Sequence, residues 1–138
     1  MITEVRIRSR KNMKQESYII DEDCIIISIS DLDKDRIIFP VNPSILDVHY
    51  EWFEDDDANT PESISENQAA AIAEFAKKWN DKSVNVICYV NCEAGMSRSA
   101  GVAAAIARYF LGNDEWIFKT KIPNRRCYRM VLDALYNF

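Results

Sequence analysis

NCEAGMSRSAG, residues 91–101, follows an apolar run, VNVICYV (residues 84–90), and leads into AGVAAAIARYF (residues 100–110). The chain has only three glycines, and two of them, Gly95 and Gly101, lie in this stretch. The apolar run is typical of a buried strand and the alanine-rich segment is typical of a helix. Loops that join such a strand to a helix bind anions, because backbone N–H groups and the helix N-terminus point at one spot. The stretch therefore predicts an anion-binding loop between a central strand and a helix.

Further strand signals lie on the N-terminal side of this stretch. EVRIRS (residues 4–9) alternates apolar and charged residues, as a half-exposed strand does. CIIISIS (residues 24–30) is rich in β-branched residues and predicts a buried strand that ends at a polar turn, DLDKD. SILDVHYEWF (residues 44–53) predicts a third strand, followed by a loop, DDDANTPES.

Helix signals alternate with these strands. Ser65 and Gln68 fit a capping box, with Ile64 placed as a hydrophobic staple, so a helix is expected to start here. Its apolar face contains Ile72, Phe75, Ala76 and Trp79. Two more helices are expected, one over about residues 98–111 that ends at Gly112-Asn113, and one from about Asn124. The last helix carries Tyr128, Val131, Leu132 and Leu135 on one face. The alternation predicts a single α/β domain over residues 1–138, with a mostly parallel central sheet of about four or five strands flanked by helices.

Composition narrows the function classes. The chain has 138 residues, 48% of them apolar, and a formal net charge of −5. This charge weighs against nucleic-acid and anionic-membrane partners. No apolar run reaches membrane-spanning length and the N-terminus, MITEVRIRSR, has no apolar signal core, so a cytoplasmic location is expected.

The four cysteines, Cys24, Cys88, Cys92 and Cys127, form no C-x2-C pair, and His49 is the only histidine. A metal site is therefore not expected. In a cytoplasmic protein the four thiols are expected to be reduced. Cys88 has two interpretations, either plain core packing or a protective disulfide with Cys92 under oxidation.

The residue types in the loop suit phosphoryl chemistry. Gly95 lets the backbone curl around an anion, and Arg98 offers planar donors that match phosphate oxygens. Backbone dipoles and Arg98 favour the thiolate form of Cys92, which is a nucleophile. Ser99 is placed to hydrogen-bond the sulfur. Each residue alone has an ordinary structural explanation, but the pattern C-x2-G-x2-R-[ST] is expected by chance in a chain of this length only on the order of once in a thousand.

CEAGMSRS (residues 92–99) resembles the C-x5-R-[ST] signature loop of cysteine-dependent protein tyrosine phosphatases. With the alanine-rich helix after it, the loop is similar to that of compact dual-specificity phosphatases of the bacterial and phage type. CIIISISDLD (residues 24–33) and PNRRCYRMVLDAL (residues 123–135) are also similar to segments of these enzymes. The resemblance is strongest from about Val84 onward and implies the protein tyrosine phosphatase-like fold.

The resemblance implies catalysis in two steps without a metal or organic cofactor. Cys92 attacks phosphorus, Ser99 assists release of the thiolate, and an aspartic acid protonates the leaving oxygen and then activates water. The phosphoryl oxygens would be held by the loop residues Glu93, Ala94, Gly95, Met96, Ser97 and Arg98. The family's segment commonly reads Phe-x-Asp at the acid, so Phe53-Glu54-Asp55 makes Asp55 the first candidate, with Asp56 the second and Asp57 the third.

The chain departs from the family directly before the nucleophile, where Asn91 replaces the usual histidine. A hydrogen bond from Asn91 to a backbone carbonyl would preserve the loop. The exchange predicts slower or more alkaline turnover than in a relative with histidine.

The favoured partner is a phosphorylated protein or peptide, with phosphotyrosine as substrate and phosphoserine and phosphothreonine left open. One alternative is a phosphatase for phosphoinositides or RNA 5′-phosphates, which the lack of positive charge at the variable loop positions disfavours. Another is a phosphate-binding module without turnover. Arg125 and Arg126 would either touch the substrate or form a solvated helix face, and His49 is interpreted as an ordinary strand residue.

Overall fold

A four-stranded sheet forms the centre of the molecule. The computed structural model describes residues 1–137, and Phe138 lies outside the described residues. The strands are β1 (Ile2–Ser9), β2 (Cys24–Ser30), β3 (Ile45–Trp52) and β4 (Val86–Cys92), in the spatial order β1-β4-β2-β3. All pairings in this sheet are parallel. The predicted α/β class with a parallel central sheet is therefore confirmed.

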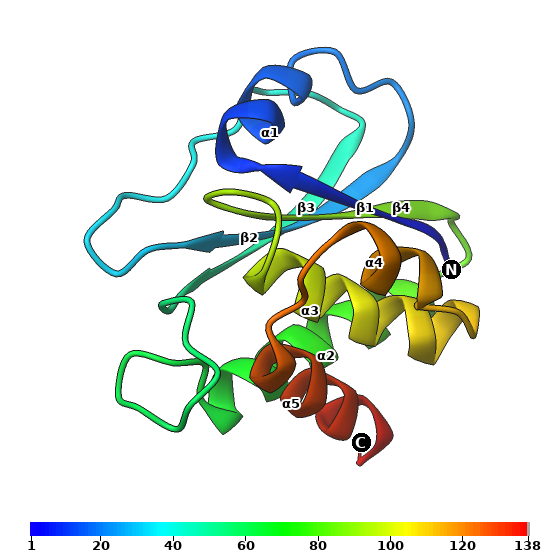
Figure 1. Cartoon of the computed structure of the whole chain (residues 1–138). Helices are drawn as coiled ribbons and strands as arrows, with labels where there is room; N and C mark the ends of the chain where they lie inside the picture. Colours follow the sequence, from blue (N-terminus) through cyan, green and yellow to red (C-terminus); the bar gives the residue numbers. More distant parts are fainter. Residues whose placement is uncertain (138) are drawn as a thin grey trace.

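Helices cover both faces of the sheet (Figure 1). One face carries α1, and the other carries α2, α3 and α5, with α4 beside them. The helices are α1 (Arg10–Glu16), α2 (Glu66–Asn80), α3 (Arg98–Ile106), α4 (Glu115–Thr120) and α5 (Arg125–Tyr136). The capping box predicted at Ser65 and Gln68 is present at the start of α2.

Side-chain alternation in β4 divides the core between the two faces. Cys88 and Val90 belong to the larger cluster, with α2, α3 and α5. Ile87 and Tyr89 belong to the smaller cluster, with Met13 of α1. Every residue of β4 is buried because the strand is paired on both sides and covered on both faces.

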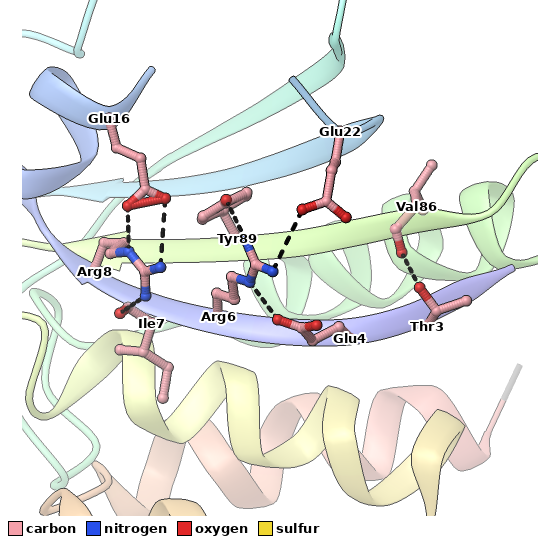
Figure 2. Close-up of polar contacts among 9 residues, drawn as sticks. All are labelled: Thr3, Glu4, Arg6, Ile7, Arg8, Glu16, Glu22, Val86 and Tyr89. Carbon is pink, nitrogen blue, oxygen red and sulfur yellow. Dashed lines mark hydrogen bonds and ion pairs between the residues drawn. The ribbon is translucent and has the colours of Figure 1, made fainter. Parts of the chain in front are cut away.

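On the α1 side, charged residues of the edge strand β1 close over Tyr89 (Figure 2). Arg6 donates to the Tyr89 hydroxyl at 2.8 Å, and the Arg8 guanidinium lies 5.4 Å from its ring centre. Arg8 also pairs with Glu16 of α1 at 2.8 Å. The Arg8–Glu16 pair holds α1 against the end of β1. This end of β1 lies next to the loop that follows β4.

Three details of the predicted elements need correction. The fourth strand runs from Val86 to Cys92, two residues later than the apolar run suggested. The predicted helix over residues 98–111 changes at Ala107 into a π-helical turn, η1 (Ala107–Leu111), which ends at Gly112 with a left-handed φ of 75°. The short helices α1 and α4 carry no strong periodic signal and were not expected.

The second glycine of the opening stretch sets the distance between α3 and α5. A Cβ atom at Gly101 would lie 2.5 Å from the Asn124 carbonyl oxygen and 2.9 Å from Cys127 Cβ. Only glycine allows this approach without displacement of α5. Gly101 thereby brings Asn124, the N-cap of α5, next to the start of α3.

Candidate active site

Cys92 ends β4 at the floor of the loop formed by residues 93–97. Its Sγ lies 3.0 Å from Ser99 Oγ and accepts a hydrogen bond from the Gly95 N–H at 3.3 Å. Cys92 is 2% exposed and Ser99 is fully buried. The structure thus brings together the predicted nucleophile and the serine predicted to assist it.

The loop is held from outside through its carbonyl groups. Arg10 N–H donates to the Glu93 carbonyl at 3.1 Å, Ile122 N–H to that of Met96 at 3.1 Å, and Asn124 N–H to that of Ser97 at 2.9 Å. No cis peptide bond occurs among the described residues. In a trans peptide the carbonyl and the next N–H point in opposite directions. The N–H groups of residues 94, 97 and 98 therefore point away from these outer donors and toward the inside of the loop.

Gly95 makes this loop geometry possible. Its φ is 68°, a left-handed conformation that glycine adopts readily. A Cβ atom at this position would lie 2.6 Å from Ser9 N and 2.7 Å from the Arg8 carbonyl carbon. The loop therefore lies directly on the backbone at the end of β1.

Arg98 starts α3 and is 5% exposed. Its Nη1 donates to the Phe53 carbonyl at 2.7 Å, and its Nη2 pairs with Asp31 Oδ1 at 2.8 Å. The Nε–H has no hydrogen-bond partner within the described residues. This N–H is therefore a buried donor available to an anion or to a water molecule.

Of the three acid candidates, Asp55 is the one that contacts the loop. Its Oδ1 accepts hydrogen bonds from Ser97 Oγ at 2.8 Å and from Asn124 Nδ2 at 3.0 Å. Asp56 accepts from Ala58 N–H and from the Thr60 hydroxyl, within its own loop. Asp57 makes no hydrogen bond or ion pair within residues 1–137. Asp55 is therefore held at the loop, Asp56 is used in a turn, and Asp57 has no partner among the described residues.

A hollow of about 330 Å³ opens beside the loop. Ile122 and Pro123 supply apolar wall, and Arg125 is the cation that lines it. The remaining lining residues are Asp55, Asp56, Asp57, Ser97 and Asn124. Ser97 connects this hollow to the loop, and Asp55 lies at their junction.

Asn91 lies beneath the loop without the hydrogen bond that was expected of it. It is fully buried, and neither its Nδ2 nor its Oδ1 has a partner within the described residues. Ser28, its register partner in β2, is also buried with an unpartnered hydroxyl. The prediction that Asn91 hydrogen-bonds a backbone carbonyl is therefore wrong. The Asn91 amide and the Ser28 hydroxyl, which are neighbours, both lie without hydrogen-bond partners at the base of the site.

Sequence reasoning missed two residues that contact the site. Asp31 was assigned to a polar turn, yet it binds Arg98 from the end of β2. Asn124 was interpreted as a helix start, yet its side chain both caps α5 through Cys127 N–H and donates to Asp55. Asp31 directly follows β2, and the carboxyl ends of parallel strands lie side by side, so its position near Cys92 could have been predicted from the sequence.

The other side chains singled out from the sequence lie as follows. Arg126 donates to the Ile64 carbonyl at 2.9 Å and to Asn59 Oδ1 at 3.3 Å, so it is held against the segment before α2. Arg125 is exposed at the hollow. His49 pairs with Glu51 at 2.8 Å and packs on Phe75, as a strand residue would. Glu93 pairs with Lys34 at 3.0 Å.

Three of the four cysteines lie in apolar surroundings that disfavour the charged thiolate. Burial raises the pKa of Cys24 to about 11 and those of Cys88 and Cys127 to about 12. All four thiols are free. Within residues 1–137, no group of three or more histidine, cysteine, aspartate or glutamate side chains is arranged to hold a metal ion. No helix in that part of the chain has the length and apolarity needed to cross a membrane.

Comparison with solved structures identifies proteins of the same fold. Human DUSP28 superposes with a TM-score of 0.64 at 14% sequence identity, over 96% of this chain and 92% of DUSP28. PTPMT1 in complex with PI(5)P gives 0.59 at 15% identity, over 97% and 91% of the two chains. Another PTPMT1 crystal structure gives 0.57 at 14% identity, over 97% and 90%. No family model and no curated protein sequence matches the chain. Both neighbours are protein tyrosine phosphatase-like phosphatases, and at these identities they show the shared fold.

The raised pKa values of Cys24, Cys88 and Cys127 allow a labelling test of the predicted nucleophile. We expect iodoacetamide near neutral pH to modify Cys92 first in the folded protein, because thiols with pKa values near 11 or 12 are almost entirely protonated there. Peptide mass spectrometry after brief labelling measures the order of modification. Labelling in denaturant, where all four thiols should react, is the control. Equal labelling of Cys88 or Cys127 in the folded protein would contradict this prediction.

Proposed function

We propose that the chain is a cysteine-dependent phosphatase that hydrolyses phosphotyrosine in proteins. The observation that carries the proposal is the buried guanidinium of Arg98, whose Nε–H has no partner, in the same loop as the Cys92–Ser99 contact. These are an anion anchor and a nucleophile on one rigid loop. The fold shared with DUSP28 and PTPMT1 supports the same reaction class.

In the first step, Cys92 Sγ attacks phosphorus and the bond to the ester oxygen breaks. Arg98 and the inward-pointing loop N–H groups stabilise the charge on the other phosphoryl oxygens. Asp55 gives its proton to the leaving oxygen. The hydrogen bonds from Ser97 and Asn124 to Oδ1 hold this carboxyl at the rim of the loop.

In the second step, a water oxygen attacks phosphorus and the S–P bond breaks. Asp55, now a carboxylate, accepts the proton from that water. Ser99 Oγ, 3.0 Å from the sulfur, donates a hydrogen bond to the departing thiolate. The products are an alcohol or phenol and inorganic phosphate, and the enzyme is restored.

The hollow beside the loop favours an aryl phosphate. Ile122 and Pro123 offer apolar surface to a phenol ring whose ester oxygen faces Asp55. The ring also places the phosphoester bond farther from the peptide backbone, so that the phosphoryl group reaches into the loop. Phosphoserine and phosphothreonine, with shorter side chains, are predicted to be poorer substrates.

Phosphate release from a phosphotyrosine peptide, without added metal, tests the proposal directly. Wild-type protein is expected to release phosphate, while Cys92→Ser binds the peptide without turnover because the hydroxyl is a far weaker nucleophile. Equal release by both proteins would exclude the thiolate mechanism. Binding by both without any release would identify a phosphate-binding module.

The role of Asp55 is tested with leaving groups of different basicity. Asp55→Asn is expected to lower kcat for phenyl phosphate by roughly a hundredfold or more, because a basic leaving oxygen needs its proton. The loss should be much smaller for para-nitrophenyl phosphate, which leaves readily without protonation. Asp81→Asn, an exposed change at the end of α2, is the control. Equal losses with both substrates would assign the proton to another group.

Asn91 provides a test of the residue beneath the nucleophile. Asn91→His is expected to raise kcat or to extend activity to lower pH, because the imidazole can form the hydrogen bonds that the buried amide lacks. A pH–rate profile of both proteins measures the effect. Ser28→Ala, which removes only the neighbouring hydroxyl, is the matched control. An unchanged rate and profile would show that Asn91 does not limit turnover.

A further inference from the structure

The loop is surrounded by carboxylates, which we call the acidic rim. Two of them approach Arg98: Asp31 Oδ1 lies 2.8 Å from Nη2, and Glu54 Oε2 lies 4.0 Å from Nη1. Three line the hollow, and one belongs to the loop itself. The rim consists of Asp31, Glu54, Asp55, Asp56, Asp57 and Glu93.

The nearby cations are fewer and mostly engaged. Lys34 is paired with Glu93 at 3.0 Å. Arg10 donates to the Ser30 hydroxyl at 3.2 Å and to the Asp35 carbonyl at 2.6 Å. Arg98 is buried at the loop, and among residues 1–137 Arg125 is the one cation that lines the hollow. Even with Asp55 protonated, as the proposed first step requires, the rim carboxylates outnumber these four cations.

Within the part of the chain that the structure describes, the loop provides donors for one phosphoryl group. Arg98 has a free Nε–H for it, and the inward-pointing loop N–H groups surround the same space. A second phosphate on the same ligand would meet Asp55, Asp56 and Asp57 in the hollow, with Arg125 alone to offset them. When its first phosphate is bound in the loop, a polyphosphorylated ligand would thus have its second phosphate repelled by the carboxylates of the hollow.

Asp57 is the rim residue best placed to act on a substrate. Asp56 is used by Ala58 and Thr60, and Asp55 by Ser97 and Asn124. Asp57 is exposed, lines the hollow and has no partner within residues 1–137. An unpaired carboxylate at this place complements a cationic side chain next to the phosphorylated residue.

From the acidic rim around a single phosphoryl anchor, we infer that this site selects singly phosphorylated peptides with lysine or arginine beside the phosphotyrosine. It discriminates against ligands that carry further negative charge, such as phosphoinositides. The inference rests on the proposed function and specifies the substrate class for the same loop.

A peptide series of constant length measures the preference. The phosphotyrosine is flanked by lysine and arginine, by alanine and serine, or by aspartate and glutamate, and PI(5)P in neutral phospholipid vesicles serves as the anionic probe. We expect kcat/KM to decrease in that order, by roughly threefold to tenfold for each flanking charge reversed. The differences should shrink as salt is added.

Asp57 variants test the residue that carries the argument. The measured quantity is the ratio of kcat/KM for basic and acidic peptides, which cancels any general change in activity. Asp57→Asn is expected to reduce this ratio by roughly threefold to tenfold, and Asp57→Lys should reduce it further. Glu74→Lys makes the same change of charge as Asp57→Lys, but on the exposed face of α2, and should leave the ratio unchanged.

The outcomes separate this inference from the proposed function. If no substrate is hydrolysed, the proposed function fails, and binding of the same peptides to Cys92→Ser, followed by fluorescence anisotropy, still measures the charge preference. Turnover with equal or higher kcat/KM for acidic peptides would overturn the inference alone. Faster release from PI(5)P than from the basic peptide would also overturn it and would identify a lipid phosphatase.

Discussion

The site depends on the parallel pairing of β4 between β1 and β2. This pairing places the carboxyl end of β4 between the carboxyl ends of β1 and β2. The loop after Cys92 can then rest on the β1 backbone through Gly95, while Asp31 at the end of β2 reaches Arg98. A shift of one residue in β4 would turn Cys92 to the other face of the sheet and separate these groups.

The central stretch was predictable because its signals are local. Strand, loop and helix are consecutive there, and Gly95, Arg98 and Ser99 lie within seven positions of Cys92. The capping box at Ser65 is equally local. The limits of β4 were displaced by two residues because pairing, and not apolarity alone, decides where a strand starts and ends.

Residues that reach the site from other segments were harder to predict. Asp31 and Asn124 are far from Cys92 in sequence, and their roles follow from the sheet order and from the close packing of α3 on α5 at Gly101. The helices α1 and α4 are short and depend on tertiary contacts, so their sequences alone give a weak signal. The unsatisfied amide of Asn91 could be recognised only once its surroundings were known.

If the proposed function holds, Arg98 illustrates a consequence of orienting a ligand-binding side chain before its ligand arrives. A free arginine side chain carries about 2 kcal/mol of rotamer entropy. Here the Phe53 carbonyl and Asp31 fix the guanidinium in the folded chain, so that freedom is lost on folding and not on binding. Each encounter with a phosphoryl group then meets a donor that is already oriented. Under the proposed function the same rigidity acts on the product, because free phosphate would find the guanidinium as well ordered as the ester did and would have to leave before the next turnover.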